Sequence, residues 1–122
     1  MNILIVERDP VFRSNMARVL AEHHAIEIAE NAERGFEIAM RRDIHIIITG
    51  HQFGMGMGGA EFSLEVKRYI TRRIAIILTS ELAEPLPHEA DRFLSRPFDA
   101  EILLEIITDL TRNQKVACSD FC

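Results

Sequence analysis

Five short segments of the chain carry the hydrophobic pattern of β-strands. Three of them are aliphatic runs, one alternates apolar with polar residues, and one is a brief apolar pair. In chain order the five segments are residues 3–6, 25–29, 44–48, 74–78 and 93–94. Aliphatic runs are typical of strands buried on both faces, whereas alternating or short ones suit the edges of a sheet. The pattern therefore predicts three interior strands and two edge strands.

Four intervening stretches place apolar residues at helical spacing, over residues 9–22, 31–41, 60–69 and 99–112. Asp9, followed by Pro10, predicts the start of the first helix, and Asp99 predicts the start of the last. Aspartate caps helix N-termini, and proline suits the first turn. The last helix is expected to bury its whole apolar stripe. The stripes are formed by Phe12, Met16, Val19, Leu20, Phe36, Met40, Phe62, Val66, Tyr69, Ile102, Leu103, Ile106 and Leu110.

The alternation of strands and helices predicts the topology. It indicates right-handed crossovers and a parallel sheet with helices on both faces. The fold class is therefore α/β: a single doubly wound, five-stranded parallel sheet in the flavodoxin-like order 2-1-3-4-5. In such a sheet the site lies beyond the carboxyl ends of the strands, beside the first strand. The residues that this rule selects are Glu7, Arg8, Asp9, residues 49–59, Thr79, Ser80, Ser95, Arg96 and Pro97.

Composition and charge narrow the class of protein. The chain has 122 residues, is 48% hydrophobic and carries a formal net charge of −5, which fits an ordinary globular domain and argues against nonspecific nucleic-acid binding. Its apolar runs are too short for a transmembrane helix and no signal-peptide pattern opens it, so we expect a cytoplasmic protein. We divide the chain into a domain over residues 1–112 and a C-terminal tail over residues 113–122. Cys118 and Cys122, in that tail, form no recognisable zinc or disulfide pattern.

Several segments resemble, in the right order, the motifs of the receiver domain of two-component response regulators. The resemblance covers residues 2 to about 112. The segments that carry it are the strand and acidic turn at 3–10, Gly35, the helix start at 59–62, the strand at 76–80, and residues 93–98. In that family two acidic residues after the first strand bind Mg²⁺, and an Asp that ends the third strand accepts a phosphoryl group. A Thr or Ser and a Lys contact the phosphoryl oxygens. The resemblance also implies a cis peptide bond between Arg96 and Pro97.

The chain departs from the family pattern at three of these functional positions. No carboxylate occurs in residues 44–60, so Gly50 and His51 stand where the phosphoacceptor is expected. Arg8 occupies the second position of the acidic pair, and a guanidinium repels a cation instead of binding it. Arg96 replaces the Lys, which keeps the charge but changes the hydrogen-bond geometry. We therefore expect no metal ion and no other cofactor.

Two further expectations follow from these departures. The stretch from residue 79 to residue 96 is short for the family and contains two prolines, so the fourth helix of the family is expected to be shortened or irregular. Arg8 is expected to replace the metal ion by pairing with Glu7 or Asp9, since clustered carboxylates need a cation. The alternative is an Arg8 side chain that points into solvent.

Residues 50–59 form the most unusual segment and hold five of the six glycines. One interpretation is a flexible loop in which Phe53, Met55 and Met57 contact a partner or join the core. The other is a cradle for a phosphate or a nucleotide, because glycines let backbone N–H groups approach an anion. The candidate ligand or partner residues of this loop are Phe53, Gly54, Met55, Gly56 and Met57.

The functional prediction is an atypical receiver domain that is not phosphorylated at the usual Asp, is not an enzyme, and signals by protein–protein contact. Its partners are expected to be other signalling proteins, a kinase or an effector, with a homodimer left open and with no nucleic acid or membrane. The alternative function is a module of the same fold that senses a small anion or a nucleotide with loop 50–59. The vestigial phosphorylation pocket is predicted to comprise Glu7, Arg8, Asp9, Gly50, His51, Thr79, Ser80, Arg96 and Pro97.

Overall fold

A computed structural model describes the backbone of residues 1–121 and the side chains of residues 1–112. Strands and helices alternate up to β4, as the hydrophobic pattern predicts, and β5 then follows β4 directly. The elements are β1 (Asn2–Val6), α1 (Pro10–Leu20), β2 (Ala25–Ala29), α2 (Ala32–Arg41), β3 (Ile46–Thr49), α3 (Gly59–Tyr69), β4 (Ala75–Ser80), β5 (Arg92–Ser95) and α4 (Ala100–Phe121). Cys118 and Cys122 lie outside the residues whose side chains are described.

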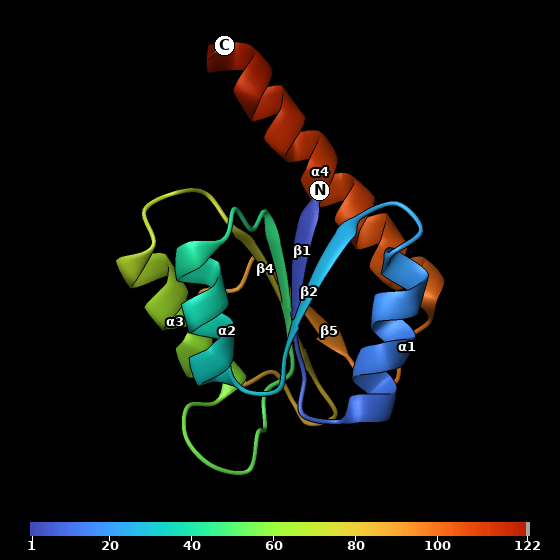
Figure 1. Cartoon of the computed structure of the whole chain (residues 1–122), viewed down its shortest axis with the longest axis vertical. Coiled ribbons are helices and arrows are strands. Elements are labelled where there is room, and N and C mark those ends of the chain that lie inside the picture. Colours follow the sequence, from blue (N-terminus) through green and yellow to red (C-terminus); the bar gives the residue numbers. More distant parts are fainter. Residues whose placement is uncertain (122) are drawn as a thin grey trace.

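The sheet has five parallel strands in the order β2-β1-β3-β4-β5. The predicted order, with β2 and β5 at the edges, is therefore confirmed. The three interior strands are almost wholly buried, because helices cover both of their faces. Because the strands are parallel, all their carboxyl ends lie at the same end of the sheet, at the bottom of Figure 1.

Helices α2 and α3 cover one face of the sheet, and α1 and α4 cover the other (Figure 1). Alternate residues of each strand point to opposite faces, so Leu4 belongs to the first core and Ile5 to the second. At Gly35 of α2 the helix approaches the sheet so closely that a Cβ atom would lie 2.7 Å from Cγ2 of Val6. This close approach explains the glycine inside a helix.

The helix starts agree with the sequence. Asp9 caps α1 by accepting a hydrogen bond from the amide of Val11 at 2.9 Å, and Asn31 caps α2 through the amide of Arg34 at 2.8 Å. These caps satisfy backbone donors that lack partners in the first turn. Helix α4 begins where it was expected but continues past residue 112 to Phe121, so the predicted end of this helix is wrong.

Some apolar stripe residues lie outside the core. Met40 and Tyr69 are 55% and 56% exposed. Ile102 is 43% exposed, and Ile107, which was not predicted, is buried beside Leu103 in its place. Helical periodicity identifies an apolar face but not the part of that face that the sheet covers. The burial predicted for Ile102 is therefore wrong.

The connection between β4 and β5, residues 81–91, contains no helix. It is held by polar contacts to the body of the domain. The Asp91 carboxylate accepts hydrogen bonds from the amide of Ile76 at 2.8 Å and from Nζ of Lys67 at 3.1 Å. The buried Ser63 hydroxyl accepts one from the amide of Glu89 at 3.0 Å. The fourth helix of the receiver family, which was expected to be shortened or irregular, is therefore absent from residues 81–91.

Within residues 1–121, no helix is both long and apolar enough to cross a membrane.

Candidate functional site

A cavity of about 370 Å³ opens at the carboxyl ends of β1, β3 and β4. Eight of the nine residues predicted for the pocket line it, and the ninth, Pro97, directly follows one of them. The eight are Glu7, Arg8, Asp9, Gly50, His51, Thr79, Ser80 and Arg96. The peptide bond between Arg96 and Pro97 is cis, as expected.

The centre of the site is a buried ion pair between Arg96 and Glu7. Nη2 of Arg96 donates to Oε1 of Glu7, and the two side chains are only 14% and 6% exposed. The other carboxylate oxygen of Glu7 accepts a hydrogen bond from the amide of Asp9 at 2.9 Å. Both oxygens of this buried carboxylate therefore have partners within the protein, as burial of a charge requires.

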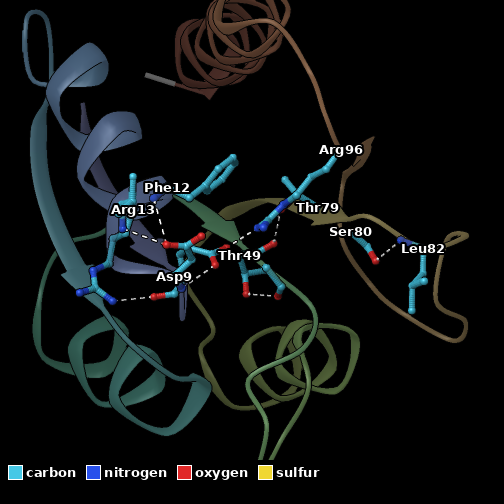
Figure 2. A network of polar contacts seen from close by, with 11 residues as sticks. Asp9, Phe12, Arg13, Thr49, Thr79, Ser80, Leu82 and Arg96 are labelled. Carbon is cyan, nitrogen blue, oxygen red and sulfur yellow. Dashed lines mark hydrogen bonds and ion pairs between the residues drawn. The ribbon is translucent and has the colours of Figure 1, made fainter.

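Two neighbours hold the guanidinium of Arg96 in this position. Thr79, fully buried on β4, accepts hydrogen bonds from Nε at 3.0 Å and from Nη2 at 2.8 Å. The ring of Phe12 on α1 lies against the other side, 4.2 Å from the guanidinium carbon, which is a favourable cation–π distance. Figure 2 shows Arg96 reaching across the strand ends between Thr79 and the α1 side of the pocket.

The ion pair needs a residue without a side chain at position 50. A Cβ atom on Gly50 would lie 2.7 Å from Oε1 of Glu7 and 3.0 Å from Nη2 of Arg96. Both distances are shorter than ordinary van der Waals contacts, so any side chain here would push against the pair. Gly50, Arg96 and Glu7 thus form one mutually dependent arrangement, although they come from three different strand ends.

Arg8 does not take the role predicted for it. The cation that pairs with Glu7 is Arg96, and Arg8 is exposed at the rim. Its guanidinium lies beside Gly54, where a Cβ atom would be only 3.0 Å from Nη1. The prediction that Arg8 pairs with Glu7 or Asp9 is therefore wrong. Consecutive residues after a strand point in different directions, whereas Arg96 reaches the pocket from β5.

The two carboxylates that follow β1 do not suit Mg²⁺. Glu7 is neutralised by Arg96, and Oδ1 of Asp9 accepts hydrogen bonds from the first turn of α1 at 2.9 and 3.4 Å. A hard divalent cation needs several free oxygen ligands, and a guanidinium beside them opposes it. Among the described residues no group of three His, Cys, Asp or Glu side chains could hold a metal ion.

The remaining pocket residues organise the backbone. His51 accepts the amide of Gly59 on its carbonyl at 2.8 Å, and its Nδ1 lies 3.4 Å from the amide nitrogen of Ala60, so it fixes the start of α3. The Ser80 hydroxyl accepts the amide of Leu82 at 3.0 Å and turns the chain after β4 (Figure 2).

The glycine-rich loop is folded against the domain. Phe53 and Met57 pack on the core under α2 and α3, while Met55 is 89% exposed. Gly54 and Gly56 have φ values of +89° and +79°, a conformation that other residues rarely adopt. Of the three large side chains of the loop, Met55 is thus the most accessible to a partner, whereas Phe53 and Met57 are partly buried.

Two backbone amides of this loop, those of Met57 and Gly59, donate hydrogen bonds within the protein. Met57 donates to Oε1 of Glu33 on α2 at 3.0 Å, and Gly59 donates to the carbonyl of His51. A Cβ atom on Gly56 would lie 2.5 Å from the same Glu33 oxygen, so the loop and α2 are in tight contact. A carboxylate at this point opposes an anion, which weighs against the phosphate or nucleotide cradle.

Two contributions to the site could not be anticipated. Phe12 was assigned only to the apolar stripe of α1, yet its ring also supports Arg96. Arg13 donates to the carbonyl of Glu7 at 2.8 Å and braces the turn after β1 (Figure 2). An aromatic and an arginine in the first turns of a helix that follows the site strand are the only signal that the sequence offers for them.

Comparison with solved structures decides what this architecture resembles. The superposition with the N-terminal domain of a response regulator/sensory box/GGDEF 3-domain protein from Carboxydothermus hydrogenoformans has a TM-score of 0.84 at 19% identity, over 97% of this chain and 99% of that chain. The chain has the fold of a response-regulator receiver domain. No protein-family model matches the sequence, and no curated protein matches it either.

Other structures with this receiver fold agree. A CheY-like response regulator receiver domain protein from Methanospirillum hungatei gives a TM-score of 0.81 at 23% identity, over 93% of this chain and 96% of that one. The response regulator TrrA from Thermotoga maritima, solved in complex with Mg²⁺ and BeF, gives 0.80 at 23% identity, over 89% and 97%. The likeness extends over nearly all of each receiver structure.

Proposed function

We propose that this protein is a signalling module of the receiver fold whose pocket is held in one state by an internal ion pair, so that it works without phosphorylation and by contact with other cytoplasmic signalling proteins. The observation that carries the proposal is the buried pair between Arg96 and Glu7 above a glycine at position 50. By the resemblance to receiver domains, Gly50, Glu7 and Arg96 would correspond to the phosphoacceptor, a metal ligand and the lysine of that family.

The chemistry of the pocket supports this proposal. Phosphoryl transfer to a carboxylate needs an acceptor oxygen and a cation that neutralises the incoming charge. Residues 44–60 contain no carboxylate. The guanidinium of Arg96 already donates hydrogen bonds to Glu7 and Thr79. Among the described residues that line the cavity, the Thr79 hydroxyl accepts hydrogen bonds from Arg96 and the Ser80 hydroxyl accepts one from the amide of Leu82, which supports a role other than catalysis.

The pair also supplies internally what a cation would otherwise supply. In a receiver domain with the full acidic pair, the repulsion between carboxylates is relieved by Mg²⁺, so its pocket depends on metal and phosphoryl donor. Here the positive charge is covalently part of the chain, and it is always present because the arginine guanidinium keeps its proton. The pocket is then independent of the Mg²⁺ concentration and of the supply of phosphoryl donors.

Intact-mass spectrometry after incubation with acetyl phosphate and Mg²⁺ tests the proposal. The unmodified protein should gain no phosphoryl group, and millimolar Mg²⁺ should leave its thermal unfolding midpoint unchanged. The comparison is a triple variant, Gly50→Asp with Arg8→Asp and Arg96→Lys, which restores the acceptor, the acidic pair and the lysine together. This variant should show Mg²⁺-dependent stabilisation, as a ligand of the native state does, and a base-labile phosphoryl adduct.

Either of two results with the unmodified protein would contradict the proposal. One is a stoichiometric, base-labile phosphoryl adduct. The other is calorimetric binding of Mg²⁺ at millimolar concentration.

A further inference from the structure

A second surface, separate from the pocket, lies between α2 and α3. It is a groove of about 560 Å³ lined by Glu33, Phe36, Met40, Met57, Glu65 and Tyr69. The rings of Phe36 and Tyr69 meet edge to face, with their centroids 6.4 Å apart, and join the two helices across it. Met57 brings the glycine-rich loop to the same groove, since its amide is bound to Glu33.

The groove contains apolar side chains that are exposed and do not belong to the core of the domain. Met40 and Tyr69 continue the apolar stripes of α2 and α3 past the sheet and are more than half exposed. Met55, on the loop that delivers Met57, is 89% exposed. Clustered exposed apolar side chains mark contact surfaces, and methionines adapt to the shape of a partner. These residues are therefore available to a second molecule.

The charged side chains that line the groove are negative. Its two charged lining residues are Glu33 and Glu65, and Glu65 has no ion pair among the described side chains. The basic side chains of the same helices have partners of their own. Arg34 and Arg41 pair with Glu37, Lys67 pairs with Asp91, and the guanidinium carbon of Arg68 lies 5.4 Å from the centroid of the Tyr69 ring. An occupant with positive charges beside apolar side chains fits this pattern.

We propose that the groove between α2 and α3 binds an amphipathic helix of a partner protein that carries lysine or arginine beside its apolar face. An apolar groove between two helices accepts the side chains of such a helix at positions i, i+3, i+4 and i+7. Glu33 and Glu65 then meet its basic residues. A second copy of this chain fits less well, because the copies carry a net charge of −5 each. The inference rests on the proposed function, for which it names the contact surface.

Amide chemical-shift mapping of the ¹⁵N-labelled protein with a synthetic probe tests this inference. The probe is a peptide of leucine and lysine whose leucines recur at helical spacing. A peptide of the same composition without that spacing, and a leucine–glutamate peptide with it, serve as controls. The basic amphipathic peptide should shift amides of residues 33–40, 56–58 and 62–69 in a saturable way. The two control peptides should bind at least about tenfold more weakly.

Matched charge reversals separate the groove from general attraction to an acidic protein. Glu65→Lys should weaken binding of the basic peptide about tenfold, whereas Glu105→Lys, an equal change on the exposed side of α4, should change it less than twofold. Tyr69→Ser tests the apolar part at an exposed position and should also weaken binding several-fold. Because the shift map uses the unmodified protein, the inference stays testable even where a variant unfolds.

Four outcomes would overturn the inference: no saturable binding, shifts spread over other faces, equal binding of the control peptides, or equal effects of the two charge reversals. Shifts of the groove amides with protein concentration alone would assign the groove to a second copy and would overturn it as well. None of these results bears on the reaction with acetyl phosphate. Failure of the groove and failure of the proposed function are therefore read from different measurements.

Discussion

Replacing Arg96 by methionine is the most direct test of the ion pair. Methionine keeps an apolar contact with the ring of Phe12 but removes the guanidinium, so the carboxylate of Glu7 stays buried without a counter-charge. Breaking one side of a buried pair costs about 3–5 kcal/mol. The lower end applies here, about 3 kcal/mol, because Glu7 keeps its hydrogen bond from the amide of Asp9.

That loss converts to a large shift in thermal stability. For 122 residues the unfolding entropy is about 0.26 kcal/mol per kelvin, so Arg96→Met should lower the unfolding midpoint by about 12 °C. The chain has no tryptophan, so far-ultraviolet circular dichroism is the suitable signal for thermal and urea unfolding. Urea titration then gives the free energy of unfolding independently.

A surface pair provides the control. Nη2 of Arg92 lies 2.8 Å from Oδ2 of Asp109, but the two side chains are 42% and 50% exposed. Arg92→Met should therefore lower the free energy of unfolding by only about 0.2–1 kcal/mol. In the double variant of Arg96→Met with Glu7→Gln no buried charge remains. It should therefore be more stable, by about 2 kcal/mol, than the sum of the single losses predicts. If Arg96→Met costs no more than Arg92→Met, or if the double variant is simply additive, the ion pair does not hold the pocket.

Three further substitutions test the packing and the polar contacts described above, each by the same urea titration. Gly35→Ala should destabilise by about 1–3 kcal/mol because the new methyl group meets Val6, and a gain in stability would show that the contact relaxes freely. Asp9→Ala should cost about 1 kcal/mol through the lost helix cap, with the exposed Ser14→Ala in the same helix nearly neutral; equal losses would contradict the cap. Asp91→Ala should cost about 1–3 kcal/mol because it leaves a buried β4 amide without its acceptor, and no loss would mean that another group replaces it.

Much of the fold could be predicted because strand burial leaves a strong pattern. The aliphatic runs of β1, β3 and β4 and the alternation of β2 distinguish interior from edge strands, and together with the rule for doubly wound sheets that distinction indicates the order of the sheet. The candidate pocket followed from the rule that carboxyl ends of parallel strands meet. The helical stripes were less informative, since Met40 and Tyr69 obey the period of the helix but lie beyond the edge of the core.

The pairing inside the pocket could not be predicted from neighbouring positions. Adjacency in the sequence favours Arg8, which directly follows Glu7, but the Glu7 side chain is buried and that of Arg8 is exposed. Arg96 lies 89 positions away from Glu7 in the sequence. It reaches Glu7 because β1 and β5 are parallel, so their carboxyl ends lie at the same end of the sheet. Which of two arginines enters a pocket depends on the length and direction of each side chain in space, which composition and spacing do not report.

The contact between Gly50 and the ion pair also constrains how this protein can change by mutation. Gly50→Asp alone would press a second carboxylate against Oε1 of Glu7, where even a Cβ atom lies only 2.7 Å away, and both would compete for one guanidinium. Arg96→Lys alone would substitute a shorter point charge for the guanidinium that donates to both Thr79 and Glu7. Each step toward a phosphorylatable pocket is thus costly until the others are present. Changes that are costly singly but tolerated together show positive epistasis, so only a concerted set of substitutions could convert this pocket into a phosphorylatable one.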